Sequence, residues 1–292
     1  MFHFTYLQAI VVGLLQGVTE LFPVSSLGHA VLLPAWLGGG WKLFAADPQY
    51  LLIAVAFHFA SAIALFLVYG RRWITILASA SRGLRKSAAA GSGLPLLTRL
   101  IVGTIPVAII GIALNKFFEK NFGKPFLAAI FLSINGILLL SVERLTHRRH
   151  AHARAKDADA AIVERVSVGQ AFVVGMGEST ALLAGISRFG VSMSFGMLRG
   201  LSRSVAADFA FLLAFPAIIG ASLVKLPKLL HHGAIAAGSS GPLLAGTITA
   251  FIATFISVTF LVKYFTTKTL RPFAIYCLVV GLISIIRFGI FG

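Results

Sequence analysis

Three acidic side chains lie within long apolar stretches of the sequence, where a charged group needs a specific reason to be present. They are Glu20, Glu178 and Asp208. An ionisable residue at such a place indicates function by default, because burial away from water is costly. Asp208 lies near the end of its stretch, so we expect it to form an ion pair with Arg203 or Arg199. The other six acids fall in predicted loops or at span ends: Asp47, Glu119, Glu143, Asp157, Asp159 and Glu164.

Polar residues around Glu20 have a spacing that suits an anion. Gln16 precedes Glu20 by four positions and shares its helix face. Pro23 ends that helix, and Ser25 or Ser26 can cap the next one and leave its first amide groups free for a phosphate. His29 follows Ser26 by about one turn, so a hydroxyl and an imidazole can face the same anion.

A second segment repeats this arrangement with a cation in place of a hydroxyl. Gly185 and Ser187 repeat the loop and the cap, and Arg188 stands where the first segment has Ser26. Arginine is suited to bidentate phosphate contact. If both turns meet, one cavity contains the side chains of Glu20, Glu178, Ser25, Ser26, His29 and Arg188. That set fits a diphosphate with a divalent cation.

Structural roles are the alternatives for several of these residues. A serine in an apolar helix often bonds back to its own backbone. Arg188 can extend toward the membrane interface as a residue at a helix end. His58 lies in the middle of an apolar stretch among aromatic residues, which favours a packing role over a ligand role.

The two segments align with each other. Residues 12–28 match residues 174–190, which superimposes Gly13 on Gly175, Gln16 on Glu178 and Ser25 on Ser187. Residues 105–111 also match residues 215–220. We therefore predict an internal duplication, with a first repeat at about 5–118 and a second at about 162–263.

Composition places the site in a membrane. The 292 residues are 58% hydrophobic and 12% charged, against roughly 25% charged residues in soluble domains. Runs of about 20 apolar residues, enough to cross a bilayer, occur near 51–70, 99–118, 125–143, 204–226, 241–263 and 272–291. Residues 5–37 and 162–198 are apolar but interrupted. We predict one all-α membrane domain over 1–292, with six full spans and two re-entrant helical hairpins, about ten helices in all.

The positive charge is placed in loops, which argues against nucleic-acid binding despite a net charge of +16. Residues 71–99 and 144–165 hold six Lys or Arg each and should be cytoplasmic. Residues 200–203 and 264–271 are then inside as well, whereas residues 38–50, 119–124 and 227–240 are outside. The two interrupted segments consequently enter from opposite sides, the first around Pro23 from outside and the second around Gly185 from inside, as an inverted repeat requires. The basic 144–165 loop can contact anionic lipid.

These motifs resemble those of the undecaprenyl pyrophosphate phosphatase family, bacterial membrane proteins linked to bacitracin resistance. The family's first motif is matched by Gln16, Glu20 and the PVSSLGH run at 23–29. Its second, PG-x-SRSG, resembles AGISRFG at 184–190, and HFAS at 58–61 is similar to the family's HLGT. Leu27, Ala184 and Phe189 depart from the pattern by replacing Thr, Pro and Ser, which removes hydroxyls beside the expected phosphate site.

The resemblance implies hydrolysis of undecaprenyl diphosphate to the monophosphate carrier of cell-wall synthesis, with Mg²⁺ or Ca²⁺, in the bacterial inner membrane. It implies that Glu20 binds metal or acts as a base, that Ser26 is the preferred nucleophile, and that His29 assists proton transfer. Arg188 would hold phosphate. Further substrate contacts are expected from Gln16, Ser25, Gly28, Ser187 and Gly190.

Four matters stay open at this point. The nucleophile is Ser26, His29 or a metal-activated water. Glu178 stands where the family commonly has Gln, whereas Gln16 stands where it often has Glu, so we hypothesise that a metal-binding carboxylate has moved between the repeats. The alternative function is a non-hydrolytic polyprenyl-phosphate carrier or flippase on the same scaffold, and a homodimer is one assembly open to the chain.

Overall fold

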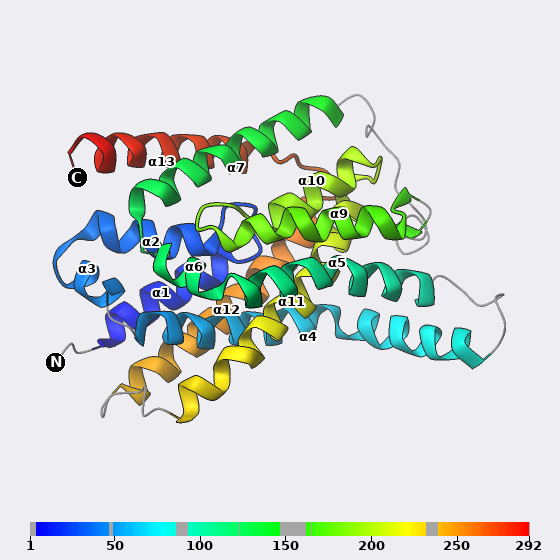
Figure 1. Cartoon of the computed structure of the whole chain (residues 1–292), viewed down its shortest axis with the longest axis horizontal. Coiled ribbons are helices and arrows are strands. Elements are labelled where there is room, and N and C mark those ends of the chain that lie inside the picture. Colours follow the sequence, from blue (N-terminus) through cyan, green and yellow to red (C-terminus); the bar gives the residue numbers. More distant parts are fainter. Residues whose placement is uncertain are drawn as a thin grey trace.

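The structure is a bundle of α-helices that run mostly along one axis (Figure 1). It is a computed structural model that describes residues 4–46, 49–85, 93–121, 123–146, 162–163, 165–231 and 239–291. Six helices are long and apolar enough to cross a membrane. They are α4 (Gln49–Arg85), α5 (Gly93–Ala113), α7 (Pro125–Thr146), α11 (Arg203–His231), α12 (Ser240–Tyr264) and α13 (Arg271–Ile290). The prediction of an all-helical, multi-pass membrane protein with six spans is confirmed.

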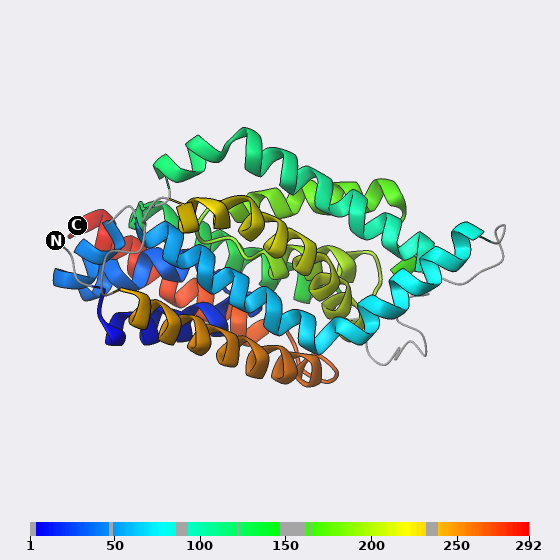
Figure 2. The same ribbon diagram turned by 90° about the horizontal axis from the view of Figure 1, so that it is seen from below.

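Helix α4 is much longer than the predicted span. It continues to Arg85, so most of the predicted 71–99 loop is helical. Its sequence contains no proline, and its Arg, Ala and Leu residues are good helix formers. A 37-residue helix is about 55 Å long, well beyond a hydrocarbon core of about 30 Å. Figure 2 shows its cyan end projecting past the neighbouring helices.

Helix α5 also differs from its predicted bounds. It starts at Gly93 and ends at Ala113, whereas the apolar run suggested 99–118. Arg99 therefore lies within the helix, where its guanidinium donates to the carbonyl oxygens of Val163 and Val166. These bonds hold the start of α5 against the segment before α9. Within the basic 144–165 loop, residues 147–161 and 164 lie outside the described residues.

Four helices are too short to cross a bilayer and form two consecutive pairs. The first pair is α1 (Tyr6–Thr19) and α2 (Ser26–Leu37); the second is α9 (Val168–Ser179) and α10 (Arg188–Leu198), with the 3₁₀ turn η1 (Thr180–Leu182) between them. At 14 residues, α1 is about 21 Å long. The connecting turns lie close together inside the bundle in Figure 1.

Two further short helices, α3 (Gly39–Ala46) and α6 (Asn115–Asn121), were not predicted. They bring the α-helices within the described ranges to twelve, where about ten were expected from six spans and two pairs. Each begins after a one-residue break that follows a longer helix, α2 in the case of α3 and α5 in the case of α6. Both are too short for a hydrophobic period to distinguish a helix from a loop in the sequence.

Close helix packing depends on glycine. Helix α1 lies along α12, and α9 lies along α5. A Cβ added to Gly13 would lie 2.3 Å from the Gly246 carbonyl oxygen, and one added to Gly175 would lie 2.0 Å from the Gly103 carbonyl oxygen. Such contacts let backbones approach closely, as small residues do between membrane helices. They place the ends of α1 and α9, and thus both turns, in the protein interior.

Candidate active site

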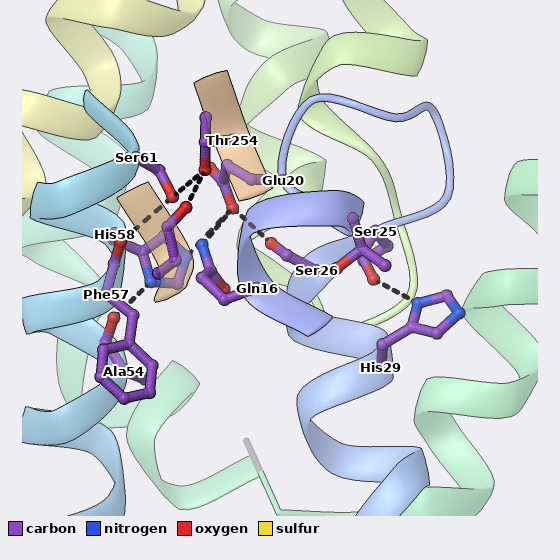
Figure 3. A network of polar contacts seen from close by, with 12 residues as sticks. Gln16, Glu20, Ser25, Ser26, His29, Ala54, Phe57, His58, Ser61 and Thr254 are labelled. Carbon is purple, nitrogen blue, oxygen red and sulfur yellow. Dashed lines mark hydrogen bonds and ion pairs between the residues drawn. The ribbon is translucent and has the colours of Figure 1, made fainter. Parts of the chain in front are cut away.

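Glu20 follows the last turn of α1 and is contacted by three polar side chains, two through hydrogen bonds and one as an ion-pair partner (Figure 3). Its Oε2 accepts from Gln16 Nε2 at 2.8 Å and from Ser26 Oγ at 2.5 Å. His58 Nε2, from α4, lies 3.3 Å from the same oxygen. The four-residue spacing therefore places Gln16 and Glu20 in contact, and the turn returns the chain so that Ser26 faces the carboxylate. This geometry orients the serine hydroxyl hydrogen toward a potential base.

Ser25, rather than Ser26, caps α2. Its Oγ accepts from Gly28 N at 3.2 Å and from Gly185 N at 3.1 Å, so one hydroxyl joins the two turns. The backbone of Ser25 has φ 69° and ψ 100°. A non-glycine residue in this region costs about 1–3 kcal/mol, and such strain is concentrated at functional sites. The residue that carries the strain immediately precedes Ser26.

The second turn is built in the same way. Ser187 caps α10 by accepting from Gly190 N at 3.1 Å. Its own amide donates to Asn135 Oδ1 at 3.0 Å, while Asn135 Nδ2 donates to the Pro23 carbonyl oxygen at 2.9 Å. One asparagine from the middle of α7 thus fixes both turns. Sequence reasoning missed Asn135, although a polar amide in an apolar span was a signal that could have identified it.

Two glycines allow the turns to touch. A Cβ on Gly28 would lie 2.9 Å from Gly185 Cα. Gly185 has φ 116°, and a Cβ there would lie 2.5 Å from the Ala128 carbonyl oxygen. Both the backbone conformation and the lack of space require glycine at Gly185.

Arg188, the first residue of α10, lines a pocket together with the Glu20 cluster. The pocket-lining residues are Glu20, Ser25, Ser26, Leu27, His58, Ala181, Ile186, Ser187 and Arg188. Among the described residues, the buried Nε and Nη1 of Arg188 have no hydrogen-bond partner. Unsatisfied buried donors are rare and call for an explanation. A guanidinium with two donors that lack a partner in the described structure, in the same pocket as a serine hydroxyl held on a carboxylate, is suited to bind an anion beside that hydroxyl.

Glu178 and His29 lie apart from this pocket. Glu178 is fully buried in α9; Oε1 accepts from Ser192 Oγ, and Oε2 has no partner within the described chain. The ring of His29 is turned away from Glu20 in Figure 3, with Nδ1 2.8 Å from the Ser25 carbonyl oxygen. The structure therefore gathers Gln16, Glu20, Ser25, Ser26, Ser187 and Arg188, with Gly28 and Gly190 in the caps.

Two sequence interpretations need correction. His58, considered a packing residue, lines the pocket beside Glu20, and its Nδ1 is held 2.7 Å from the Ala54 carbonyl oxygen. Asp208 pairs with neither Arg203 nor Arg199: Arg72 Nη1 lies 3.0 Å from its carboxylate, and the Tyr69 hydroxyl donates to it at 2.6 Å. Asp208 faces α4 because it lies on the side of α11 that packs there.

Arg203, at the start of α11, was a predicted partner of Asp208 and has a different partner in the structure. Arg203 pairs with Glu143, which is fully buried on α7 and also accepts from Leu270 N at 3.1 Å. Glu143, predicted to be at a span end, therefore links α7, α11 and the residue before α13. Removing one partner of such a buried pair is strongly destabilising.

The aromatic departure at Phe189 does not intrude on the pocket. Its ring is buried, with its centroid 4.6 Å from that of Phe211 and 5.9 Å from that of Phe265. Phe189 thus belongs to the core of the bundle, while the neighbouring Arg188 faces the pocket. The hydroxyl expected at this position from the motif would lie among aromatic rings.

A metal would have one carboxylate in this pocket. Glu20 is the acidic residue that lines it, and the described ranges contain no group of three or more His, Cys, Asp or Glu side chains placed to hold a metal. Mg²⁺ is commonly bound by one or two carboxylates together with substrate phosphates. The donors therefore fit a cation that arrives with a phosphorylated substrate.

Comparison with known proteins gives a consistent result over the whole chain. A family model described as bacitracin resistance protein BacA matches residues 9–283. The undecaprenyl-diphosphatase of Mycolicibacterium paratuberculosis is 42% identical over 299 residues, with 97% of each chain covered. Undecaprenyl-diphosphatase 2 of Frankia alni is 38% identical, with 99% of this chain and all of its own length covered. The corresponding protein of Acidiphilium cryptum is 40% identical over 97% of this chain and 98% of its own. The chain belongs to the bacitracin resistance protein BacA family.

Proposed function

We propose that this protein hydrolyses undecaprenyl diphosphate to undecaprenyl phosphate and inorganic phosphate, and so recycles the lipid carrier of cell-wall synthesis. The observation that carries the proposal is that Nε and Nη1 of Arg188, in the pocket that contains Ser26 and Glu20, have no hydrogen-bond partner among the described residues. Relatives that this chain matches over nearly their full length are named undecaprenyl-diphosphatase, which supports the same substrate class.

The terminal phosphate of the substrate would be bound between Arg188 and the start of α2. Arg188 can donate two hydrogen bonds to phosphate oxygens. The cap occupies Gly28 N, which leaves the preceding amides of α2 directed at the anion, as helix N-termini are. The positive charge of Arg188 and the amides of α2 would stabilise the negative charge that develops on the phosphoryl group in the transition state.

Ser26 would be the nucleophile. Its hydroxyl donates to Glu20 Oε2, so the carboxylate can take the proton as Oγ attacks the terminal phosphorus. The bond from that phosphorus to the bridging oxygen breaks, Glu20 passes its proton to the departing oxygen, and undecaprenyl phosphate leaves with Glu20 again ionised. Water then attacks the phosphoserine, one water proton returns to Ser26 through Glu20, and phosphate is released.

A divalent cation, Mg²⁺ or Ca²⁺, would be held by Glu20 and the phosphate oxygens of the substrate. When bound, it would neutralise charge on the diphosphate. We retain the hypothesis that Glu178 contributes a second carboxylate from α9. Its Oε2 has no hydrogen-bond partner among the described residues, which leaves that oxygen available to a cation, although Glu178 does not line the pocket.

We further propose that the two short-helix pairs are re-entrant hairpins of an inverted-topology repeat. A constant offset relates three paired features: the capping boxes of Thr5 and Ser167, the helix caps of Ser25 and Ser187, and the glycine contacts of Gly13 and Gly175. The packing of α1 on α12 and of α9 on α5 supports the same relation. It matches α5 with α12, so the resemblance of 105–111 to 215–220, which lies on α11, falls outside this relation.

The isoprenoid chain would stay in apolar surroundings. A cavity of about 360 Å³ is lined on one side by Ala30, Val31 and Ala35 of α2, with Lys42 as its charged lining residue. Ala30 follows Ser26 by about one turn, so isoprene units near the diphosphate could occupy this cavity. We propose access from the outer face of the bacterial inner membrane. A homodimer is a separate hypothesis, tested by light scattering of the purified protein.

The decisive measurement is phosphate release from a polyprenyl diphosphate by the purified protein in detergent, with and without chelator. We expect chelator-sensitive release that is lost in Ser26→Ala and Glu20→Gln. Ser79→Ala is the matched control, because that serine donates to the Ile76 carbonyl oxygen of its own helix, α4, away from the pocket. A well-folded wild type that binds the lipid without releasing phosphate would favour the carrier or flippase instead.

A further inference from the structure

His29 is used at both ring nitrogens, neither of which faces the pocket. Nδ1 lies 2.8 Å from the Ser25 carbonyl oxygen, and Nε2 lies 2.7 Å from the hydroxyl of Tyr276 on α13. The two rings are stacked, with centroids 5.6 Å apart and planes at 9°. Figure 3 shows the imidazole directed at Ser25 and away from Ser26 and Glu20.

The partners determine the hydrogen positions on this imidazole. A carbonyl oxygen can only accept, so Nδ1 must carry a hydrogen and donate it to Ser25. In the neutral ring Nε2 then accepts from the Tyr276 hydroxyl. Both bonds are short, and His29 is buried.

Ser25 is the residue that most needs such a restraint. Its φ of 69° lies in the left-handed region, which few non-glycine residues occupy. His29 holds its carbonyl oxygen, while Gly28 N and Gly185 N hold its Oγ. The following residue, Ser26, lies 2.5 Å from Glu20 Oε2. Any relaxation of the Ser25 backbone would therefore move the hydroxyl of Ser26.

We propose that Tyr276 is a positioning residue, acting through His29 to hold the strained Ser25 so that Ser26 stays aligned with Glu20. This inference rests on the proposed function, in which Ser26 is the nucleophile. It assigns His29 to the support of Ser25 and gives α13, which supplies none of the pocket-lining residues, a part in the reaction.

A simpler explanation is that Tyr276 merely ties α2 to α13. The same two helices supply the test, because Trp36 Nε1 donates to Ser284 Oγ at 2.9 Å about two turns further along. Ser284→Ala removes a hydrogen bond between the same helices without touching Ser25. If only helix docking matters, Ser284→Ala and Tyr276→Phe should have equal effects.

The experiment compares kcat and KM for wild type, Tyr276→Phe and Ser284→Ala, with thermal unfolding of each variant as a folding control. Tyr276→Phe keeps the stacked ring and removes the hydroxyl. We expect kcat to fall by about three- to tenfold with KM changed by less than about twofold, since one hydrogen bond to the positioning side chain is lost. Ser284→Ala should retain kcat. Equal losses in the two variants, or none in Tyr276→Phe, would overturn the inference.

Two variants of His29 separate positioning from proton transfer. Asparagine places an amide N–H near the Nδ1 position and can still donate to Ser25, whereas glutamine places its amide near Nε2. Positioning predicts that His29→Asn retains at least about ten times the kcat of His29→Gln. If both variants are equally inactive while folded, a proton-transfer role for His29 replaces the proposed one.

A spectroscopic measurement keeps this inference distinct from the proposed function. In ¹⁵N-histidine NMR, with the His29 signals assigned through His29→Asn, we expect a protonated Nδ1 and an accepting Nε2 whose shift changes in Tyr276→Phe. A wild type that does not hydrolyse the lipid would refute the proposed function alone. The NMR spectra would then still test whether the Tyr276 hydroxyl donates to His29 Nε2. Identical His29 shifts in wild type and Tyr276→Phe would refute that contact.

Discussion

Arg188 illustrates how a single side chain can indicate a ligand. Glu20, the carboxylate that lines the same pocket as Arg188, already accepts hydrogen bonds from Gln16 and Ser26. Two nitrogens of Arg188 are left buried without a partner in the described structure. Burying unsatisfied charged donors costs free energy that a bound anion would recover. These two nitrogens are the donors that we propose bind a phosphate group.

This arrangement predicts that charge alone will not replace Arg188. Arg188→Lys keeps the positive charge and loses the planar fork, so we expect kcat/KM to fall by about ten- to hundredfold, the equivalent of one or two charged hydrogen bonds. Steady-state phosphate release measures this loss. Lys225→Arg, near the far end of α11, is a control for a Lys/Arg exchange away from the pocket. Full activity in Arg188→Lys would show that the site recognises charge without bidentate geometry.

Glu178 allows a separate test of the cation hypothesis. If its carboxylate contributes to the cation site, Glu178→Gln should raise the Mg²⁺ concentration for half-maximal activity by about tenfold or more. The glutamine keeps an oxygen for the Ser192 hydroxyl, so the fold should be retained. Unchanged Mg²⁺ dependence in Glu178→Gln, beside an altered one in Glu20→Gln, would leave Glu20 as the carboxylate that holds the cation.

At the scale of single residues, contacts within a short segment could be predicted from the sequence, whereas few contacts between distant segments could be. The spacing of Gln16 and Glu20 and the serine caps follow from helix geometry, and the structure contains them. The approach of His58 to Glu20 depends on how α4 packs against α1, which no local pattern determines. Asn135 escaped notice for the same reason, since its two partners come from turns far away in the chain.

At the scale of elements, the turn before α10 depends on one glycine. Gly185→Ala would place a side chain at φ 116° and 2.5 Å from the Ala128 carbonyl oxygen. We expect destabilisation by about 2 kcal/mol or more, with loss of activity, because both strain and overpacking are introduced. Thermal unfolding in detergent, followed beside phosphate release, measures both effects.

The matched control lies in the same helix pair. Gly169, in the first turn of α9, has nothing within 4 Å of an added Cβ. Gly169→Ala should leave stability unchanged or raise it slightly, since alanine favours helix. Equal melting temperatures for Gly169→Ala and Gly185→Ala would show that the second turn tolerates a side chain.

Helix ends were harder to predict than helix existence. Hydropathy identifies the apolar part of a helix, and α4 continues past the apolar run at 51–70, through Arg71 and Arg72, to Arg85. A helix does not need to stop where the membrane does, because charged residues with good helix propensity extend it. The capping boxes that start at Thr5 and Ser167 were visible local signals for the starts of α1 and α9.

At the scale of the whole molecule, the proposal requires the two turns to enter from opposite sides of the membrane. The long basic extension of α4 is at one end of the bundle, and α3 with both described chain ends is at the other (Figures 1 and 2). The positive-inside rule assigns the first end to the cytoplasm. Because the leaflet that presents the substrate depends on this assignment, orientation bears directly on function.

Single-cysteine labelling tests the orientation with little change to the protein. The chain has one native cysteine, Cys277, which is buried, so the wild type is an unlabelled control. Gly40, with no atom within 4 Å of an added Cβ, and exposed Thr267 lie at sites predicted to be outside and inside. In intact cells, a membrane-impermeant maleimide should label Gly40→Cys and not Thr267→Cys, and permeabilisation should expose both. The reverse pattern would invert the orientation of the protein, so that the substrate would reach Ser26 and Arg188 from the cytoplasmic face.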